Sequence, residues 1–233
     1  MKHQLRQNNT VLRPICLLNI LLLVPLFIWV FALSGCQKSV DYFSYVSEFR
    51  NNIFLAETDG LCLYIHSVLK ETPYAADGVA NESTARTEVF LSAPEGTQNY
   101  TLYIEVDGKQ YGGELAFDNV KAEYFLSFSL DISELKELPC VLQCGESKWQ
   151  FVASSVLRNE TVTPRNILDN VRAYAPEIFE NLTDKYGFKG EIYLRLLYED
   201  APYYYVGVID RNGDIYAFLV NATNGKVLAR RNP

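Results

Sequence analysis

Short runs in which apolar and polar residues alternate follow one another through the first half of the chain. A period of two is typical of β-strands that bury one face. Turn residues separate the runs, and Thr58-Asp59-Gly60 and Asp107-Gly108 both favour tight hairpins because Asp and Gly tolerate positive φ angles. The strands that we expect are 52–57, 61–69, 87–92, 100–106, 110–117, 123–130 and 148–156.

This series of strands predicts an antiparallel β-sandwich-like domain over residues 49–157, of about immunoglobulin size. The preceding residues, 36–48, are interpreted as a tether. The stretch 42–53 stays ambiguous, because Tyr42, Val46, Phe49 and Ile53 also have helical spacing.

The hydrophobic period changes after a break at residues 158–164. Thr163-Pro164 is typical of a helix start, with an N-cap and a proline in the first turn. Pro176 should kink or split this helix, and Gly187 is placed to end it. The apolar residues that recur every three to four positions, as in a helix that covers a sheet, are Ile167, Leu168, Val171, Ile178, Phe179 and Leu182.

Three further strands are expected at 191–198, 203–210 and 214–221, with a short fourth at 226–229. A hairpin at Arg211-Asn212-Gly213 joins the second strand to the third, because Asn-Gly is a strong turn signal. The same segment has oxygen-bearing side chains at alternate positions, as at the start of a calcium loop. However, Ile215 stands where such a loop requires Gly, so we predict a hairpin and no metal site. The fold class is therefore mostly β, with an α+β part over residues 164–233.

The start of the chain has the features of an export segment. Residues 1–13 are basic and polar, and residues 14–35 are uncharged and long enough to span a bilayer as a helix. Leu33-Ser34-Gly35-Cys36 at the end of this run resembles the lipobox of bacterial lipoproteins. The resemblance implies a signal peptide over 1–35, removed after a diacylglycerol is attached to Cys36, and an acylated protein held on the outer face of the cell membrane. An uncleaved membrane helix is the alternative.

Composition and charge restrict the classes of partner that the protein is expected to bind. Hydrophobic residues make up 48% of the chain, and the 16 Tyr and 13 Phe favour strands. Without the export segment, the chain has 18 basic and 28 acidic residues, a net charge of −10. This acidity excludes nucleic acid as an expected partner, because binding to phosphate backbones requires clustered cations. It also indicates that attachment to the membrane depends on the acyl anchor rather than on electrostatic adhesion.

The C-terminal part resembles a known family. Tyr205-Val206-Gly207-Val208-Ile209, the Asn-Gly turn and Asn221-Ala222-Thr223-Asn224-Gly225-Lys226-Val227-Leu228 are similar to the end of a PepSY-type domain, although Asn221 stands where Asp is usual. The resemblance covers residues 164–233 and implies a helix packed on a small antiparallel sheet. It also implies an extracytoplasmic module that restrains or assists other envelope proteins, without catalytic residues. The N-terminal part is similar to lipoproteins of Gram-positive anaerobes, which implies no activity.

Reactive side chains are few. His66 is the only histidine after the export segment, and its apolar neighbours indicate an ordinary strand histidine.

Cys140 and Cys144 would lie roughly 13 Å apart in an extended segment, too far for a disulfide, whereas a turn could join them. Cys62 could also pair with either one. We favour three buried thiols over these bridges, and a three-thiolate metal site is a more remote alternative.

Tyrosines dominate the last strands. Tyr193, Tyr203, Tyr205 and Tyr216 could form an aromatic face that binds a glycan or peptide, although cross-strand packing favours the same residues. Glu199 and Asp200 could act as an acid and a base, but nothing in their spacing distinguishes them from other carboxylates. No motif for a catalytic site, a metal or a cofactor is present.

These observations lead to three hypotheses. The first is a tethered, non-catalytic lipoprotein that binds or regulates another envelope protein. The second is a surface lipoprotein that binds a glycan or peptide through its tyrosines, which would then be exposed. The third is a hydrolase of wall material, which would need a cleft with two carboxylates whose pKa values are raised.

Overall fold

The computed structural model of the protein describes residues 40–72, 79, 81–93 and 98–233. The predicted export segment and Cys36 lie outside these residues. Within the described part of the chain, no helix is both long and apolar enough to cross a membrane.

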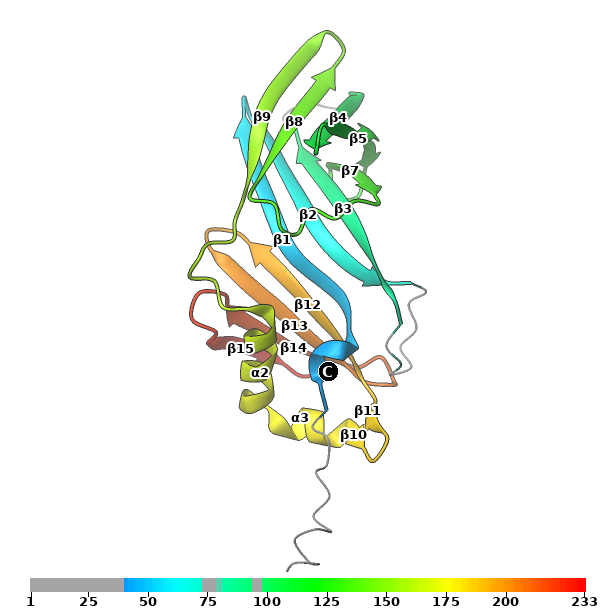
Figure 1. Cartoon of the computed structure of the whole chain (residues 1–233), viewed down its shortest axis with the longest axis vertical. Coiled ribbons are helices and arrows are strands. Elements are labelled where there is room, and N and C mark those ends of the chain that lie inside the picture. The colour runs from blue at the N-terminus through cyan, green and yellow to red at the C-terminus, as the bar shows by residue number, and fades with distance from the viewer. Residues whose placement is uncertain (1–39, 73–78, 80, 94–97) are drawn as a thin grey trace, which may run out of the picture. The chain divides into compact units, whose positions relative to one another are not determined.

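Strand β1 (Val46–Thr58) is the central element of the fold (Figure 1). It pairs with β2 (Leu61–Glu71) in antiparallel fashion along most of its length. On its other side, the first residues of β1 run parallel to β12 (Glu191–Tyr198), and Phe54 and Leu55 pair with β9 (Ser147–Ser155). One strand thus belongs to both the N-terminal and the C-terminal part of the sheet.

The described strands form a single 13-stranded sheet and a separate two-stranded hairpin. All strand pairs other than β1 with β12 are antiparallel. The remaining strands are β3 (Ser83–Ser92), β4 (Tyr100–Val106), β5 (Lys109–Glu114), β6 (Ala116–Asp118), β7 (Glu123–Phe128), β8 (Glu137–Cys144), β10 (Thr183–Asp184), β11 (Gly187–Phe188), β13 (Pro202–Ile209), β14 (Ile215–Asn221) and β15 (Val227–Arg231).

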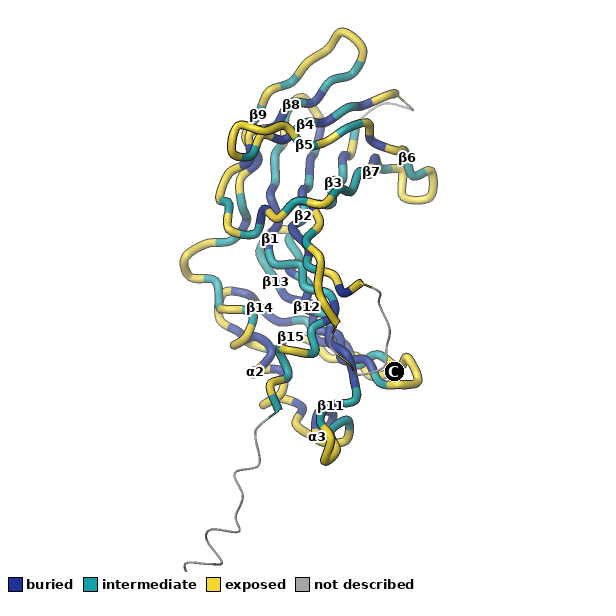
Figure 2. Tube along the Cα trace, turned by 45° about the vertical axis from the view of Figure 1, so that its right-hand side comes forward, coloured by how far each residue is buried: buried dark blue, intermediate teal, exposed yellow. Residues whose placement is uncertain are grey.

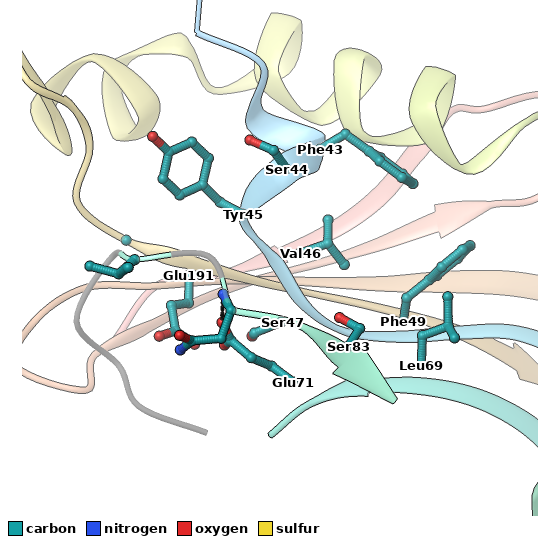
Figure 3. Close-up of a pocket in the computed structure, with 13 residues that line it drawn as sticks. Phe43, Ser44, Tyr45, Val46, Ser47, Phe49, Leu69, Glu71, Ser83 and Glu191 are labelled. Atoms are coloured by element: carbon teal, nitrogen blue, oxygen red, sulfur yellow. Dashed lines mark hydrogen bonds between the residues drawn. The ribbon is translucent and has the colours of Figure 1, made fainter. Parts of the chain in front are cut away.

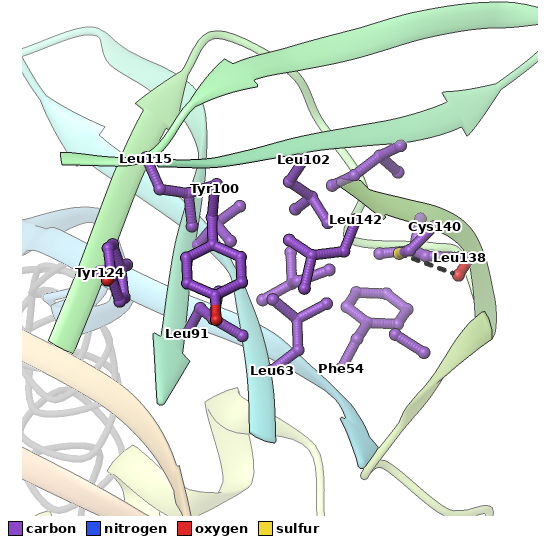
Figure 4. Close-up of a cluster of buried hydrophobic side chains, with 14 of the residues drawn as sticks. Phe54, Leu63, Leu91, Tyr100, Leu102, Leu115, Tyr124, Leu138, Cys140 and Leu142 are labelled. Carbon is purple, nitrogen blue, oxygen red and sulfur yellow. Dashed lines mark hydrogen bonds between the residues drawn. The ribbon is translucent and has the colours of Figure 1, made fainter. Parts of the chain in front are cut away.

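The N-terminal part curls into a nearly closed antiparallel sheet around one hydrophobic core. Side chains of β1, β2 and β3 meet those of β4 and β8 across this core, as Leu63, Leu91 and Leu142 show in Figure 4. All three are at most 1% exposed. The alternation of apolar residues that predicts strands therefore produces one buried face on each, and the expectation of a mostly β fold is confirmed.

The predicted hairpin turns are present. Asp59 and Gly60 have φ angles of 48° and 76°, and Asp107 and Gly108 have φ angles of 52° and 71°. Such consecutive positive φ angles are those of a type I′ turn, which matches the twist of the two strands that it joins.

Strand β8 was not among the expected strands. It contains Pro139, which removes a backbone donor and argues against a central strand. The structure explains why the proline is tolerated. The pairing of β8 with β4 ends at Cys140, so Pro139 has β9 as its partner and lies locally at an edge.

In the C-terminal part, helix α2 (Pro164–Tyr174) lies against a sheet of β12, β13, β14 and β15, and α3 (Pro176–Asn181) follows it and packs beside β10 (Figure 1). Thr163 caps α2, its hydroxyl oxygen accepting a hydrogen bond from the backbone N–H of Asn166. The break between the helices comes at Ala175, directly before Pro176, as the sequence predicts. The apolar stripe is buried at Ile167, Leu168, Val171, Ile178 and Phe179.

The expectation that Gly187 ends the helix is wrong. Helix α3 ends at Asn181, and the hydroxyl of Thr183 donates a hydrogen bond to the carbonyl oxygen of Phe179. Gly187 instead begins β11, in a small hairpin in which it pairs with Asp184. Its φ of +124° is one that side chains rarely allow, so the glycine serves the hairpin.

The ambiguous stretch before β1 combines two structures. Tyr42–Tyr45 form a short 3₁₀ turn, η1, and β1 begins at Val46, so part of the expected tether belongs to the folded part. The ring of Tyr42 packs edge-on against Phe179 and Phe188 at centroid distances of 5.1 and 5.3 Å. These contacts fix the entry of β1 against α3 and β11.

Candidate binding site

The two faces of the C-terminal sheet differ in what covers them. Leu194, Val206 and Phe218 are paired across β12, β13 and β14, and each is at most 1% exposed. Tyr174 of α2 packs edge-on against Phe218, which shows that this is the face covered by the helices. The sheet is buried through β12 and β13, whereas β15 and the loops at the strand ends are exposed (Figure 2).

The opposite side, which we call the open face, continues across five strands. Cross-strand pairing places Lys70, Glu48 and Tyr193 in one row, and Val68, Arg50, Arg195, Tyr205 and Leu219 in the next. Because paired residues point to the same side of a sheet, these rows define one surface. A third row adds Leu197, Tyr203 and Asn221.

The structure brings three of the four predicted binding tyrosines together. Tyr193, Tyr203 and Tyr205 lie on the open face and are all half-buried. Tyr216 pairs with Val208 and therefore lies on the helix-covered side, because strand residues alternate between the two faces. The prediction of one aromatic face is thus wrong for Tyr216. The sequence of a single strand does not determine which of its faces aligns with a given face of the neighbouring strand.

Arg195 lies between the aromatic rings of the open face and contacts both of them. Its guanidinium lies 4.5 Å from the ring centre of Tyr193 and 5.9 Å from that of Tyr205. Two hydrogen bonds, of 2.6 and 2.8 Å, join it to both carboxylate oxygens of Glu48. Burial opposes the charge of Arg195, but the bonds to Glu48 and its negative charge outweigh burial and raise the pKa of Arg195.

Two further cations surround Glu48. The ammonium of Lys70 lies 3.9 Å from its carboxylate. The guanidinium of Arg50 donates a hydrogen bond to the carbonyl oxygen of Leu196, and its buried Nε has no partner among the described residues. Burial lowers the pKa of Arg50, and the charge of Arg195 adds to this effect, whereas the carboxylates of Glu88 and Glu48 oppose it. Glu48 therefore lies close to three cations, and sequence reasoning singled out none of these four residues.

His66 lies next to this cluster on β2. Its ring packs against Phe90 at 4.8 Å, and its buried Nδ1 has no hydrogen-bond partner among the described residues. Burial, and secondarily the charge of Arg50, lower the pKa of His66 to about 3. A neutral imidazole in an aromatic environment fits the expected structural role better than a general acid or base near neutral pH.

The depressed pKa of His66 predicts a pH-dependent stability. In the unfolded chain His66 takes up a proton as the pH falls below about 6.5, whereas in the folded protein it stays neutral down to about pH 3. Stability should therefore decrease as the pH falls through this window, by about 2 kcal/mol between pH 6 and 4.5. Urea unfolding of wild type and His66→Phe at both pH values measures it. Equal losses in the two proteins would contradict the assignment.

Cys62, Cys140 and Cys144 are free thiols. Cys140 and Cys144 lie on the extended strand β8, where the four-residue spacing keeps them apart. Burial raises the pKa of the Cys140 thiol to about 12, which makes it a poor nucleophile. Cys62 and Cys144 are half-buried and contact the side chains of Glu57 and Gln98, respectively.

A separate pocket of about 220 Å³ lies near η1 and the end of β2 (Figure 3). Glu71 and Glu191 line it, and each is only 4% exposed. The carboxylate of Glu71 accepts a hydrogen bond from the backbone N–H of Asn81. The sequence gives no signal for this pair, because the two glutamates stand at the ends of strands far apart in the chain. Two buried carboxylates can hold a cationic group or share a proton.

The carboxylates considered from the sequence lie elsewhere. Glu199 and Asp200 are exposed in the turn between β12 and β13. Among the residues that the structure describes, no group of three or more His, Cys, Asp or Glu side chains could hold a metal ion.

In comparisons with known proteins, no family model and no curated protein matches the chain. The lipobox and the PepSY-like domain therefore stay predictions from the sequence, and function must be argued from the geometry of the open face and the pocket.

Proposed function

We propose that the protein is a lipid-anchored, non-catalytic binding protein of the cell envelope, which binds another envelope protein through the open face. The observation that carries this proposal is the cluster of Tyr193, Arg195 and Tyr205 on the face away from the helices. Tyrosine and arginine are enriched in protein interfaces and account for much of their binding energy.

The arrangement of these residues supports binding for a second reason. Arg195 is held by the two hydrogen bonds that it donates to Glu48, so it loses little conformational freedom when a partner binds. The tyrosine rings beside it are half-buried and have few rotatable bonds, so they also lose little conformational entropy on binding. The open face is thus ordered before it meets a ligand.

Two sequence-based inferences belong to the same proposal. Acylation of Cys36 would place the protein on the outer face of the membrane, where an envelope partner is accessible. A PepSY-like module over residues 164–233 would supply a regulatory role, and the packing of helix α2 on an antiparallel sheet supports this interpretation at the level of the fold.

The alternatives have weaker support. Glycan binding would use the same half-exposed tyrosines, which favours it over the remaining hypothesis. Hydrolysis by Glu71 and Glu191 is less well supported, because Glu71 already accepts a backbone hydrogen bond. Their pocket of about 220 Å³ is also smaller than the roughly 300 Å³ at which ligand sites usually begin.

Photocrosslinking in intact cells tests the proposal. A photoreactive phenylalanine derivative in place of Tyr205 should capture one envelope protein. The same derivative in place of Tyr186, which is 75% exposed in the turn between β10 and β11, should not. Capture of wall fragments alone would favour glycan binding, and equal capture from both positions would contradict a specific interface.

A further inference from the structure

The open face is positively charged although the protein as a whole is acidic. Arg86 extends the row that contains Val68 and Arg50, and Glu88 lies beside it in register with His66. The cations of this part of the sheet, Arg50, Lys70, Arg86 and Arg195, thus outnumber the two carboxylates, Glu48 and Glu88. The chain after the export segment carries a net charge of −10.

The excess charge is available to a partner. Lys70 and Arg86 are both exposed, and the contact of Lys70 with Glu48 is long, at 3.9 Å. No ion pair among the described residues includes Arg86. Because the net charge of the protein is negative, a cationic patch on one face favours the orientation in which an anionic partner can approach.

The neighbours of these cations indicate what kind of anion fits. Tyr193, Tyr205 and Leu219 lie in the same rows as the basic residues, so the face alternates charge with aromatic and apolar surface. A phosphate-rich polymer offers no apolar groups to such a surface. A polypeptide offers carboxylates for the cations and apolar side chains for the rings.

We infer that the open face binds an acidic segment of a polypeptide, an inference that rests on the proposed function and specifies the chemistry of its partner. Carboxylates of the segment pair with Lys70 and Arg86, and its apolar or aromatic side chains pack on Tyr193 and Tyr205. Glu48 keeps Arg195 over the tyrosine rings and so prevents it from closing over the site.

Fluorescence anisotropy with the full chain in non-ionic detergent tests this inference. The probe is a fluorescein-labelled random copolymer of Glu and Tyr, and the comparison is a copolymer of Lys and Tyr. We expect the acidic copolymer to bind at least tenfold more tightly, and its affinity to fall as salt screens the charges. The double variant Lys70→Gln/Arg86→Gln should weaken binding by tenfold or more.

The matched control is Lys109→Gln/Lys148→Gln, which removes two exposed charges from the N-terminal part and should leave the affinity unchanged. Both double variants should unfold at the wild-type temperature, because all four side chains are exposed. Equal effects of the two double variants, or equal binding of the basic copolymer, would overturn the inference.

Two further outcomes separate this inference from the proposed function. If poly(glycerol phosphate) binds and the acidic copolymer does not, the polypeptide assignment is overturned. If neither polymer binds while Tyr205 still captures an envelope protein in cells, the charge assignment fails and the proposed function stands. If capture in cells also fails, both are overturned.

Discussion

Replacing Glu48 by alanine is expected to lower the free energy of unfolding by about 3 kcal/mol. The carboxylate is only 13% exposed and is the shared anion of Arg195 and Lys70, with Arg50 close by. Without it, three positive charges face one another in a partly buried site, and Arg195 loses both of its hydrogen bonds. Urea denaturation followed by circular dichroism measures the loss.

The matched control for this prediction is Glu123→Ala. Glu123 pairs with Lys121 at 3.4 Å, but Lys121 is 62% exposed, so the loss should stay below about 1 kcal/mol. The double variant Glu48→Ala/Arg195→Ala should recover part of the stability, because it removes one of the uncompensated cations. A Glu48→Ala protein as stable as the control would show that Glu48 does not balance the cluster.

The Cys36→Ser variant is expected to lose all incorporation of labelled palmitate in growing cells. The lipobox interpretation requires a thiol at this position, because the acyl-bearing group is attached to sulfur before the signal peptide is removed. The variant should therefore also keep residues 1–35 and migrate as a larger protein. Metabolic labelling and mass determination of the purified protein measure both effects.

Cys16→Ser is the control for acylation, because Cys16 lies inside the apolar run of the predicted signal peptide. It should leave labelling and cleavage unchanged. The alternative of an uncleaved membrane helix gives a different result, since neither serine variant would then change the mass of the chain beyond the substitution itself.

Much of the local structure could be predicted from the sequence. The strand expected at 191–198 has the same bounds in β12, because its apolar alternation is regular and the hydrophobic face is fully buried. Pro176 predicts the split in the helix, because its missing N–H and its ring both oppose a continuous helix. In each case the deciding interaction lies within a few residues of the chain.

The open face could not be predicted in the same way. Glu48 reaches Arg195 because β1 and β12 are parallel neighbours, and the segments that form this pair are far apart in the sequence. Glu48 also lies in a stretch whose hydrophobic spacing suits either a helix or a strand, so the sequence does not assign it to a sheet face. Pairing between distant strands depends on packing of the whole sheet, which local patterns do not encode.

The central position of β1 affects how the protein folds. Val46 pairs with Ile192, so the C-terminal sheet is incomplete until the segment that forms β12 has been made. Contacts between residues so distant in sequence raise the contact order and slow folding. During that delay the flank of β1 that faces β12 offers unpaired backbone groups to other chains. We therefore expect newly synthesised molecules to be most prone to aggregation before β12 pairs with β1.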